Sequence, residues 1–233
     1  MMKKDLVSIV SESFYQYLNL DMLSSKSVLS NGIAQDIHKR LGKSYDVFSA
    51  GYGNAEKNIT ISGNLFEIGV DIAIKNNGHS IAGFGIVFLT QNFSETLKRY
   101  IEPMFGKSAM IRTAHCLYFQ VIVVLDKIPK VEADGTITGW EFVSNKDISD
   151  FETIILSNDS PLPICSPNKT LIYVVHIPDN EKLKTLDGYL SYYKKINFEM
   201  KLSQHKYEPF GSAVILNDYE TFMEKVYHTI LAI

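Results

Sequence analysis

The sequence is poor in cysteine, and this excludes several classes of protein. Only two cysteines, Cys116 and Cys165, occur in 233 residues, too few for the disulfide framework that holds small secreted domains together. Neither a Cys-x-x-Cys nor a His-x-x-x-His spacing is present, so the usual zinc-ligand patterns are missing. The chain also begins without a basic and then apolar leader. These absences predict reduced thiols in a cytoplasmic protein.

Long hydrophobic runs and an excess of positive charge are lacking as well. The longest apolar run, residues 117–125, is interrupted by Gln120 and is far shorter than the ~20 residues that a membrane-spanning helix needs. The chain has 23 lysines and arginines against 26 aspartates and glutamates, which gives a net charge of −3. No overall positive field attracts nucleic acid, so any DNA contact needs a local basic patch. We expect no membrane partner.

Two segments resemble the end of a phosphate-binding loop without completing it. Gly42-Lys43-Ser44 and Gly106-Lys107-Ser108 have the final residues of that loop, but Ile37 and Ile101 stand where its first glycine belongs. A Gly-x-Ser-x-Gly nucleophile motif is also missing. The sequence therefore offers neither a phosphate loop nor a serine nucleophile of these types.

What the sequence does contain is a clear pair of strands at residues 65–75 and 81–90. In the first strand apolar residues alternate with polar or small ones, which predicts one core face and one charged face. The apolar set is Phe66, Ile68, Val70, Ile72 and Ile74, and the other set is Glu67, Gly69, Asp71, Ala73 and Lys75. Asn76-Asn77-Gly78 supplies residues that tolerate the positive φ of a hairpin turn. The second strand carries no charge on either face.

The rest of the chain alternates helical and strand patterns, which predicts an α/β fold. We expect a mixed central sheet flanked by helices on both faces. Helices are expected at residues 3–20, 28–41, 95–104, 147–156, 180–202 and 219–231, and further strands at 58–62, 117–125, 171–177 and 213–216. The uncharged segment 117–125 reads as a central strand buried on both faces.

Asp71, the hairpin that follows it, the apolar second strand and the next helix together resemble the core of the PD-(D/E)xK, or restriction-endonuclease-like, nuclease superfamily. In that superfamily the aspartate and a glutamate in the next strand hold a divalent metal, and a lysine two residues later assists the attacking water. Aligning the strands places Gly85 at the glutamate position and Val87 at the lysine position. The resemblance therefore implies a degenerate site in which Asp71 is a vestigial metal ligand.

The resemblance continues after the second strand. The segment TQNFSETLKRYIEPMFGKSAMIR is similar to one in bacterial restriction-type nucleases, with an asparagine, then Tyr-x-Glu-x-Met-x-Gly, then Ala-x-x-Arg. The matching residues are Asn92, Tyr100, Glu102, Met104, Gly106, Ala109 and Arg112. The likeness covers residues 63–125, about a quarter of the chain, and has no counterpart in the C-terminal half.

Several candidate site residues have two interpretations. Asp71 is either the vestigial ligand or a plain surface residue. Glu67 and Lys75 share its face, but each lies four residues from Asp71, which is roughly 13 Å along the strand. The three side chains therefore cannot hold one metal. Glu95 and Lys98 are either migrated catalytic residues or an exposed ion pair within one helix.

Two clusters could contact DNA. The better one is the basic cluster, which we define as Lys98, Arg99, Lys107 and Arg112. The second interleaves aromatic and basic residues at 189–195, where the alternative is a solvated helix face whose tyrosines pack inward. The basic cluster has the same two interpretations, a DNA-contacting surface or a solvated helix face, and the nuclease resemblance supports the first.

These observations lead to one preferred hypothesis. The chain is expected to be a single domain of residues 1–233, with a nuclease-like core at about 45–178 and helices at 3–41 and 180–231 packed on it. It is expected to be a catalytically degenerate, restriction-endonuclease-like protein with a DNA-binding or partner-binding role. One alternative is an active Mg²⁺-dependent DNA endonuclease with migrated residues, and another is an interaction module without a nucleic-acid role. The partners expected are double-stranded DNA and a second copy in a homodimer, and no cofactor is expected unless Mg²⁺ serves an active enzyme.

Overall fold

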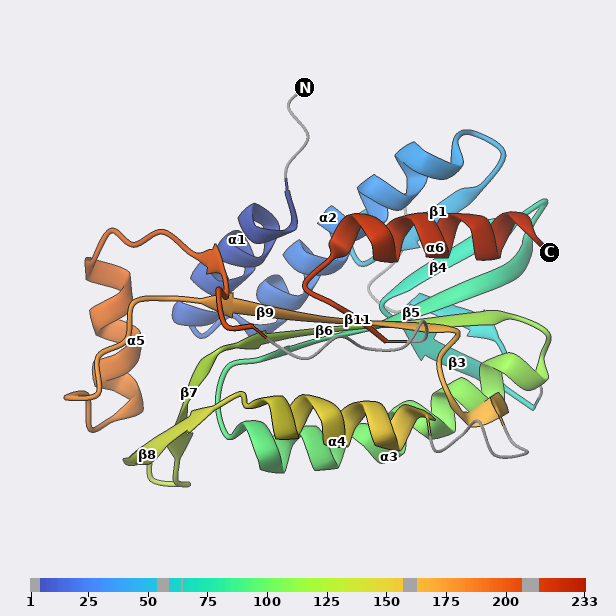
Figure 1. The fold of residues 1–233 in the computed structure, drawn as a ribbon. Helices are drawn as coiled ribbons and strands as arrows, with labels where there is room; N and C mark the ends of the chain where they lie inside the picture. The colour runs from blue at the N-terminus through green and yellow to red at the C-terminus, as the bar shows by residue number, and fades with distance from the viewer. Residues whose placement is uncertain (1–4, 54–58, 64, 157–162, 207–213) are drawn as a thin grey trace.

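A mixed β-sheet forms the centre of the molecule, with helices on both of its faces (Figure 1). The computed structural model describes residues 5–53, 59–63, 65–156, 163–206 and 214–233. The α-helices are α1 (Leu6–Leu18), α2 (Met22–Leu41), α3 (Phe93–Thr113), α4 (Asn145–Leu156), α5 (Leu186–Lys195) and α6 (Tyr219–Leu231). A short 3₁₀-helix covers Pro163–Cys165. The predicted α/β class and the helices on both faces are confirmed.

The central sheet has seven strands in the order β1-β4-β5-β6-β9-β10, and β11 also pairs with β9. Its strands are β1 (Asp46–Ser49), β4 (Ile72–Asn76), β5 (His79–Leu89), β6 (Leu117–Leu125), β9 (Lys169–His176), β10 (Lys201–Leu202) and β11 (Val214–Leu216). β5, β6 and β9 are parallel, whereas β1 and β4 form antiparallel pairs next to β5. Two separate hairpins join β2 (Ile59–Ser62) to β3 (Glu67–Val70), and β7 (Lys127–Val131) to β8 (Ile137–Phe142).

The helices divide between the two faces of the sheet. Figure 1 shows α1, α2 and α6 on one face and α3 and α4 on the other, with α5 and the β7–β8 hairpin at one end. Aspartate side chains cap the first turns of α1, α2 and α6, because each accepts a hydrogen bond from a backbone N–H three residues later. The capping residues are Asp5, Asp21 and Asp218. Most of β6 is fully buried, as its uncharged sequence predicts.

The first strand of the predicted hairpin is interrupted at Asp71. Residues 67–70 form β3, which pairs with β2 in its own two-stranded sheet, and only residues from Ile72 onward pair with β5. The β2–β3 hairpin packs against the α3 face, where a Cβ on Gly83 would lie 2.8 Å from Ile61 and 3.0 Å from Val70. Phe66, expected in the core, is 63% exposed instead. The absence of a side chain at Gly83 therefore leaves room for the hairpin that covers this part of the sheet.

Several expected boundaries differ from the structure. α2 begins at Met22 rather than 28, and α3 continues through Pro103 to Thr113, although 95–104 was expected. The helix expected at 180–202 is shorter, because α5 covers only Leu186–Lys195. The sequence patterns did not predict β1 or the β7–β8 hairpin. The ends of three expected elements, residues 3–4, 58 and 213, lie outside the described residues. The turn at Asn77-Gly78 has positive φ at both residues, as predicted.

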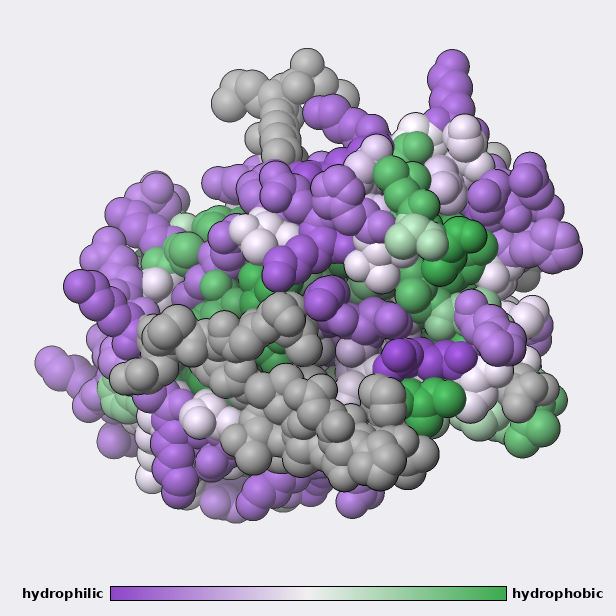
Figure 2. All heavy atoms as spheres, turned by 45° about the vertical axis from the view of Figure 1, so that its right-hand side comes forward, coloured by the Kyte–Doolittle hydropathy of each residue, from purple (hydrophilic) through white to green (hydrophobic). Residues whose placement is uncertain are grey.

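The face of the molecule in Figure 2 is covered largely by hydrophilic side chains, with hydrophobic ones in smaller groups between them. Among the residues that the structure describes, no helix combines the length and the apolar character needed to cross a membrane.

Candidate functional site

Asp71 lies at the junction of β3 and β4, directly across from the middle of β5. Ile72 is in register with Phe84, so Asp71 stands opposite Gly85 on the neighbouring strand. The Asp71 N–H donates to the Phe84 carbonyl over 2.8 Å, and the Ile86 N–H donates to Asp71 Oδ2 over 2.7 Å. The predicted pairing of these two segments is thus confirmed from Ile72 onward.

The other oxygen of the Asp71 carboxylate contacts a cation from α2. Lys26 Nζ lies 2.7 Å from Asp71 Oδ1, and the aspartate side chain is 17% exposed. Both carboxylate oxygens therefore have partners within the protein, and the ammonium compensates the negative charge. This contact could not be predicted from the sequence, because Lys26 lies 45 positions earlier, on a helix that no motif linked to the hairpin.

Polar side chains fill the space beside Gly85. A Cβ built on Gly85 would collide with Tyr118 Oη and would lie 2.5 Å from Gln120 Oε1 and 3.2 Å from Tyr100 Oη. Tyr118 Oη donates to Gln120 Oε1 over 3.0 Å, and Gln120 Nε2 donates to the Gly85 carbonyl over 2.8 Å. We call Asp71, Gly85, Tyr100, Tyr118 and Gln120 the Asp71 cluster.

The two tyrosines of the Asp71 cluster are held in their neutral form. Burial, with a further contribution from the Asp71 charge, raises the pKa of Tyr100 above its ordinary value. Burial raises the pKa of Tyr118 well above its ordinary value, and Tyr100 and Asp71 add to the effect. Their hydroxyl groups therefore stay protonated, and able to donate hydrogen bonds, to a higher pH than those of ordinary tyrosines.

These residues do not fit a divalent cation. Mg²⁺ needs carboxylates with free oxygens, but Gly85 has no side chain and the Asp71 oxygens already face Lys26 and Ile86. Val87, at the predicted lysine position, is a partly buried apolar residue that packs on the core. Across the described residues, no group of three or more His, Cys, Asp or Glu side chains is placed to hold a metal ion.

Glu95 and Lys98, the candidate migrated residues, lie on the first turns of α3. Glu95 Oε1 forms an ion pair with Arg99 Nη2 of the same helix, and both side chains are mostly exposed. Lys98 is exposed as well. The exposed intrahelical ion pair weighed for this helix thus exists, with Arg99 rather than Lys98 as the cation.

The basic cluster does not present four available cations. Arg99 is paired with Glu95, and Arg112 Nη1 donates to the Ser166 carbonyl over 2.9 Å, which ties α3 to the segment before β9. Burial lowers the pKa of Arg112 despite the opposing effect of Cys165. Lys98 and Lys107 are exposed. In the aromatic stretch at 189–195, Tyr189 and Tyr193 are buried in the core, as the alternative interpretation predicted.

A second polar cluster lies where β6 and β9 end, and it was missed in the sequence. Asp126 follows β6, and His176 is the last residue of β9. Lys127, only 6% exposed, forms ion pairs with Asp179 and Glu181 in the segment after β9. The available signal was polar residues at the carboxyl ends of two mostly apolar strands, because ligands of open α/β sheets bind beyond the carboxyl ends of parallel strands.

Comparison of the chain with protein-family models, with curated proteins and with solved structures finds no match.

Proposed function

We propose that the chain is a restriction-endonuclease-like protein that has lost its catalytic centre and functions by binding a partner. The observation that carries this proposal is the packing beside Gly85. Tyr118 Oη and Gln120 Oε1 occupy the space into which a glutamate side chain would project. Lys26 adds to this by compensating the one carboxylate that remains. The centre is thus filled and neutralised rather than merely lacking two residues.

The order of the elements supports the nuclease-like part of the proposal. The resemblance implies an aspartate before a hairpin, an apolar strand, a helix and a buried strand. Asp71, β4, β5, α3 and β6 follow one another in this order. Asp71 and Gly85 also stand opposite each other, as two ligands of one metal would.

Of the two binding roles, a protein partner is favoured over DNA. DNA affinity depends on cations that can replace the counterions of the phosphates. In the basic cluster the Arg99 and Arg112 guanidinium groups already bond to Glu95 and to the Ser166 carbonyl. Lys98 and Lys107 alone provide little charge against a chain whose net charge is −3.

We propose a cytoplasmic location, in keeping with the two free thiols.

The active-nuclease alternative is tested by a cleavage assay on long mixed-sequence duplex DNA with Mg²⁺ and then Mn²⁺. The wild type is expected to leave the DNA intact. Cleavage by the wild type that disappears in Asp71→Asn would contradict the proposal and make migration of catalytic residues the better account. The matched control is Asp46→Asn, which removes an exposed carboxylate from the edge strand β1.

DNA binding is tested separately with gel shifts at several salt concentrations. The wild type is expected to show no shift that survives physiological salt. A salt-sensitive shift that weakens in the double variant Lys98→Ala, Arg99→Ala would instead establish the basic cluster as a DNA contact.

The mass of the protein in solution, measured by light scattering, tests the expected homodimer.

A further inference from the structure

The outer edge of strand β8 has backbone groups without partners. Bonded and non-bonded residue pairs alternate along an antiparallel hairpin. The Val143 N–H, just after β8, donates to the Asp126 carbonyl, and Trp140 lies opposite Pro129, which has no N–H. The N–H and C=O groups of Trp140 and Phe142 therefore point away from β7. Across the residues that the structure describes, these groups have no hydrogen-bond partner.

The usual protection of an edge strand is present only in the first half of β8. There the pairing with β7 contains a bulge, and the Ile137 N–H already donates to the Lys184 carbonyl over 2.8 Å. The second half ends in Phe142, which is 62% exposed. Glu141 is the one charged residue of β8, and its side chain accepts a hydrogen bond from Ser94 at the start of α3. No charge of β8 thus guards its second half.

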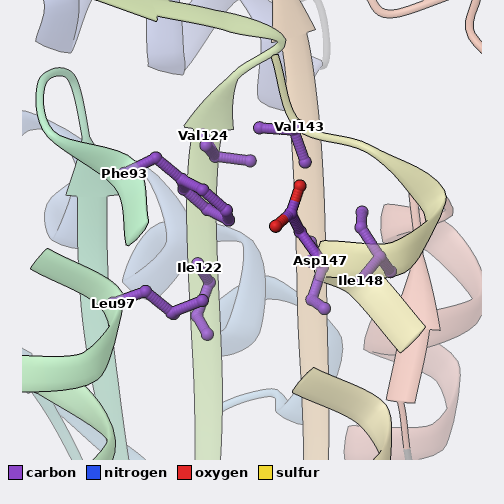
Figure 3. A pocket seen from close by; sticks show the side chains of 8 residues that line it. Phe93, Leu97, Ile122, Val124, Val143, Asp147 and Ile148 are labelled. Atoms are coloured by element: carbon purple, nitrogen blue, oxygen red, sulfur yellow. The ribbon is translucent and has the colours of Figure 1, made fainter. Parts of the chain in front are cut away.

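This half of β8 is anchored to the core. Val143 is buried and lines a small apolar crevice together with Val124 of β6 and Ile148 of α4 (Figure 3). On the other side, the Trp140 ring packs against Tyr189 of α5, with 6.2 Å between the ring centres. An edge that is held in this way needs no reordering when a further strand is added to it.

Carboxylates outnumber cations around this edge. The hairpin from β7 through β8 and residues 179–187 together hold six aspartates and glutamates and four lysines, which gives a net charge of −2. The Lys127 ammonium lies 4.7 Å from the centre of the Phe142 ring and forms ion pairs with both Asp179 and Glu181. These two carboxylates are at least half exposed and share this one cation. A cation from a partner would therefore find an acceptor beside the Phe142 ring.

We propose that the outer edge of β8 binds an extended segment of a partner protein that contains lysine or arginine residues, as a third strand of the hairpin. The backbone of the segment pairs with Trp140 and Phe142, and one of its cations lies beside the Phe142 ring and the carboxylates of Asp179 and Glu181. A second copy of the chain fits this edge less well, because its own edge would bring the same excess of carboxylates. The inference names the partner of the proposed function and rests on its partner-binding role.

The probe is a fluorescein-labelled synthetic peptide, Thr-Lys-Val-Lys-Val-Lys-Thr, whose binding is followed by fluorescence anisotropy at physiological salt. A peptide with glutamate in place of the three lysines is expected to bind at least about tenfold more weakly. Phe142→Ser is expected to weaken binding of the lysine peptide about tenfold. The matched control is Leu23→Ser, which removes an 83% exposed apolar side chain from α2 and should leave binding within about twofold.

Amide hydrogen exchange of the wild type tests the backbone pairing without any variant. The proposal requires the Trp140 and Phe142 amides to exchange at least about tenfold more slowly once the lysine peptide saturates the protein. Unchanged exchange would overturn it, as would equal binding of the glutamate peptide or an equal loss in Leu23→Ser. Protection that grows with protein concentration alone would also contradict it, because the occupant would then be a second copy.

These results and those of the cleavage assay fail separately. DNA cleavage that depends on Asp71 would contradict the proposed loss of catalysis and would leave the pairing of the peptide with β8 intact. Absence of that pairing, with the DNA uncleaved, would overturn the β8 inference alone.

Discussion

Asp71 and Asp126 are two aspartates at strand ends of one sheet, and they differ in what surrounds them. Asp71 faces a lysine and a backbone N–H, next to tyrosine and glutamine side chains that fill the adjoining space. Asp126 faces a histidine ring that is half exposed. Both oxygens of Asp71 have partners within the protein, whereas Asp126 orients an imidazole that solvent reaches. The residue type is the same, and the neighbours decide its role.

The largest effect is expected from adding atoms to the Asp71 cluster. Gly85→Ala should lower the free energy of unfolding by about 2 kcal/mol or more, because the new Cβ collides with Tyr118 Oη and Gln120 Oε1. Denaturant titration measures the change. Gly69→Ala is the matched control, since its Cβ meets nothing within 4 Å, and it should stay within about 0.5 kcal/mol. A Gly85→Ala protein as stable as that control would show that the space beside Gly85 is open.

Removing the carboxylate from the same cluster should have the next largest effect. Asp71→Ala leaves the Ile86 N–H without its 2.7 Å acceptor and should cost about 1–2 kcal/mol in unfolding free energy. Lys26→Met is expected to change stability by less than about 0.5 kcal/mol, because the Lys26 side chain is 56% exposed. A larger loss for Lys26→Met than for Asp71→Ala would mean that the ion pair, and not the backbone hydrogen bond, holds the junction.

The smallest effect is a change in alkaline stability. The pKa of Tyr100 is raised from an unfolded value of 10.0, so above pH 10 the unfolded state loses a proton that the folded state keeps. Stability therefore falls as pH rises, by up to ~1.4 kcal/mol per pH unit for each such tyrosine. Tyr100→Phe should make this fall less steep between pH 10 and 11. Denaturant titrations at each pH measure the slope of unfolding free energy against pH. An unchanged slope would indicate that Tyr100 ionises as easily in the folded protein as in the unfolded chain.

Strands and helices with strong local patterns could be predicted from the sequence. Residues 117–125 and 219–231 form β6 and α6 with the expected bounds. Where the prediction was wrong, packing overrode the local signal. The helix expected at 95–104 continues to Thr113, because Met104, Ser108 and Ile111 on its later turns are buried. The polar stretch at 180–202 contains helix-forming residues, but only 186–195 bury tyrosines on the core.

The candidate site was only half predictable. The pairing of Asp71 with Gly85 followed from period-two geometry and the turn at Asn77-Gly78. Lys26, Tyr118 and Gln120 come from other elements, and no spacing in the sequence connects them with Asp71. Asp126 and His176 are 50 residues apart and meet only because β6 and β9 are neighbours in the sheet. Local sequence patterns cannot predict contacts that depend on the order of strands in the sheet.

The central claim, that the Asp71 cluster is filled and does not hold a metal, is tested most directly with paramagnetic Mn²⁺. Substoichiometric Mn²⁺ is added to ¹⁵N-labelled wild-type protein, and line broadening of the amide signals of Asp71, Gly85 and Ile86 is compared with that of the whole chain. A bound Mn²⁺ at Asp71 would broaden these three signals first. We predict that they broaden no more than the amide signals next to exposed carboxylates elsewhere in the chain, and selective loss of all three would contradict the account.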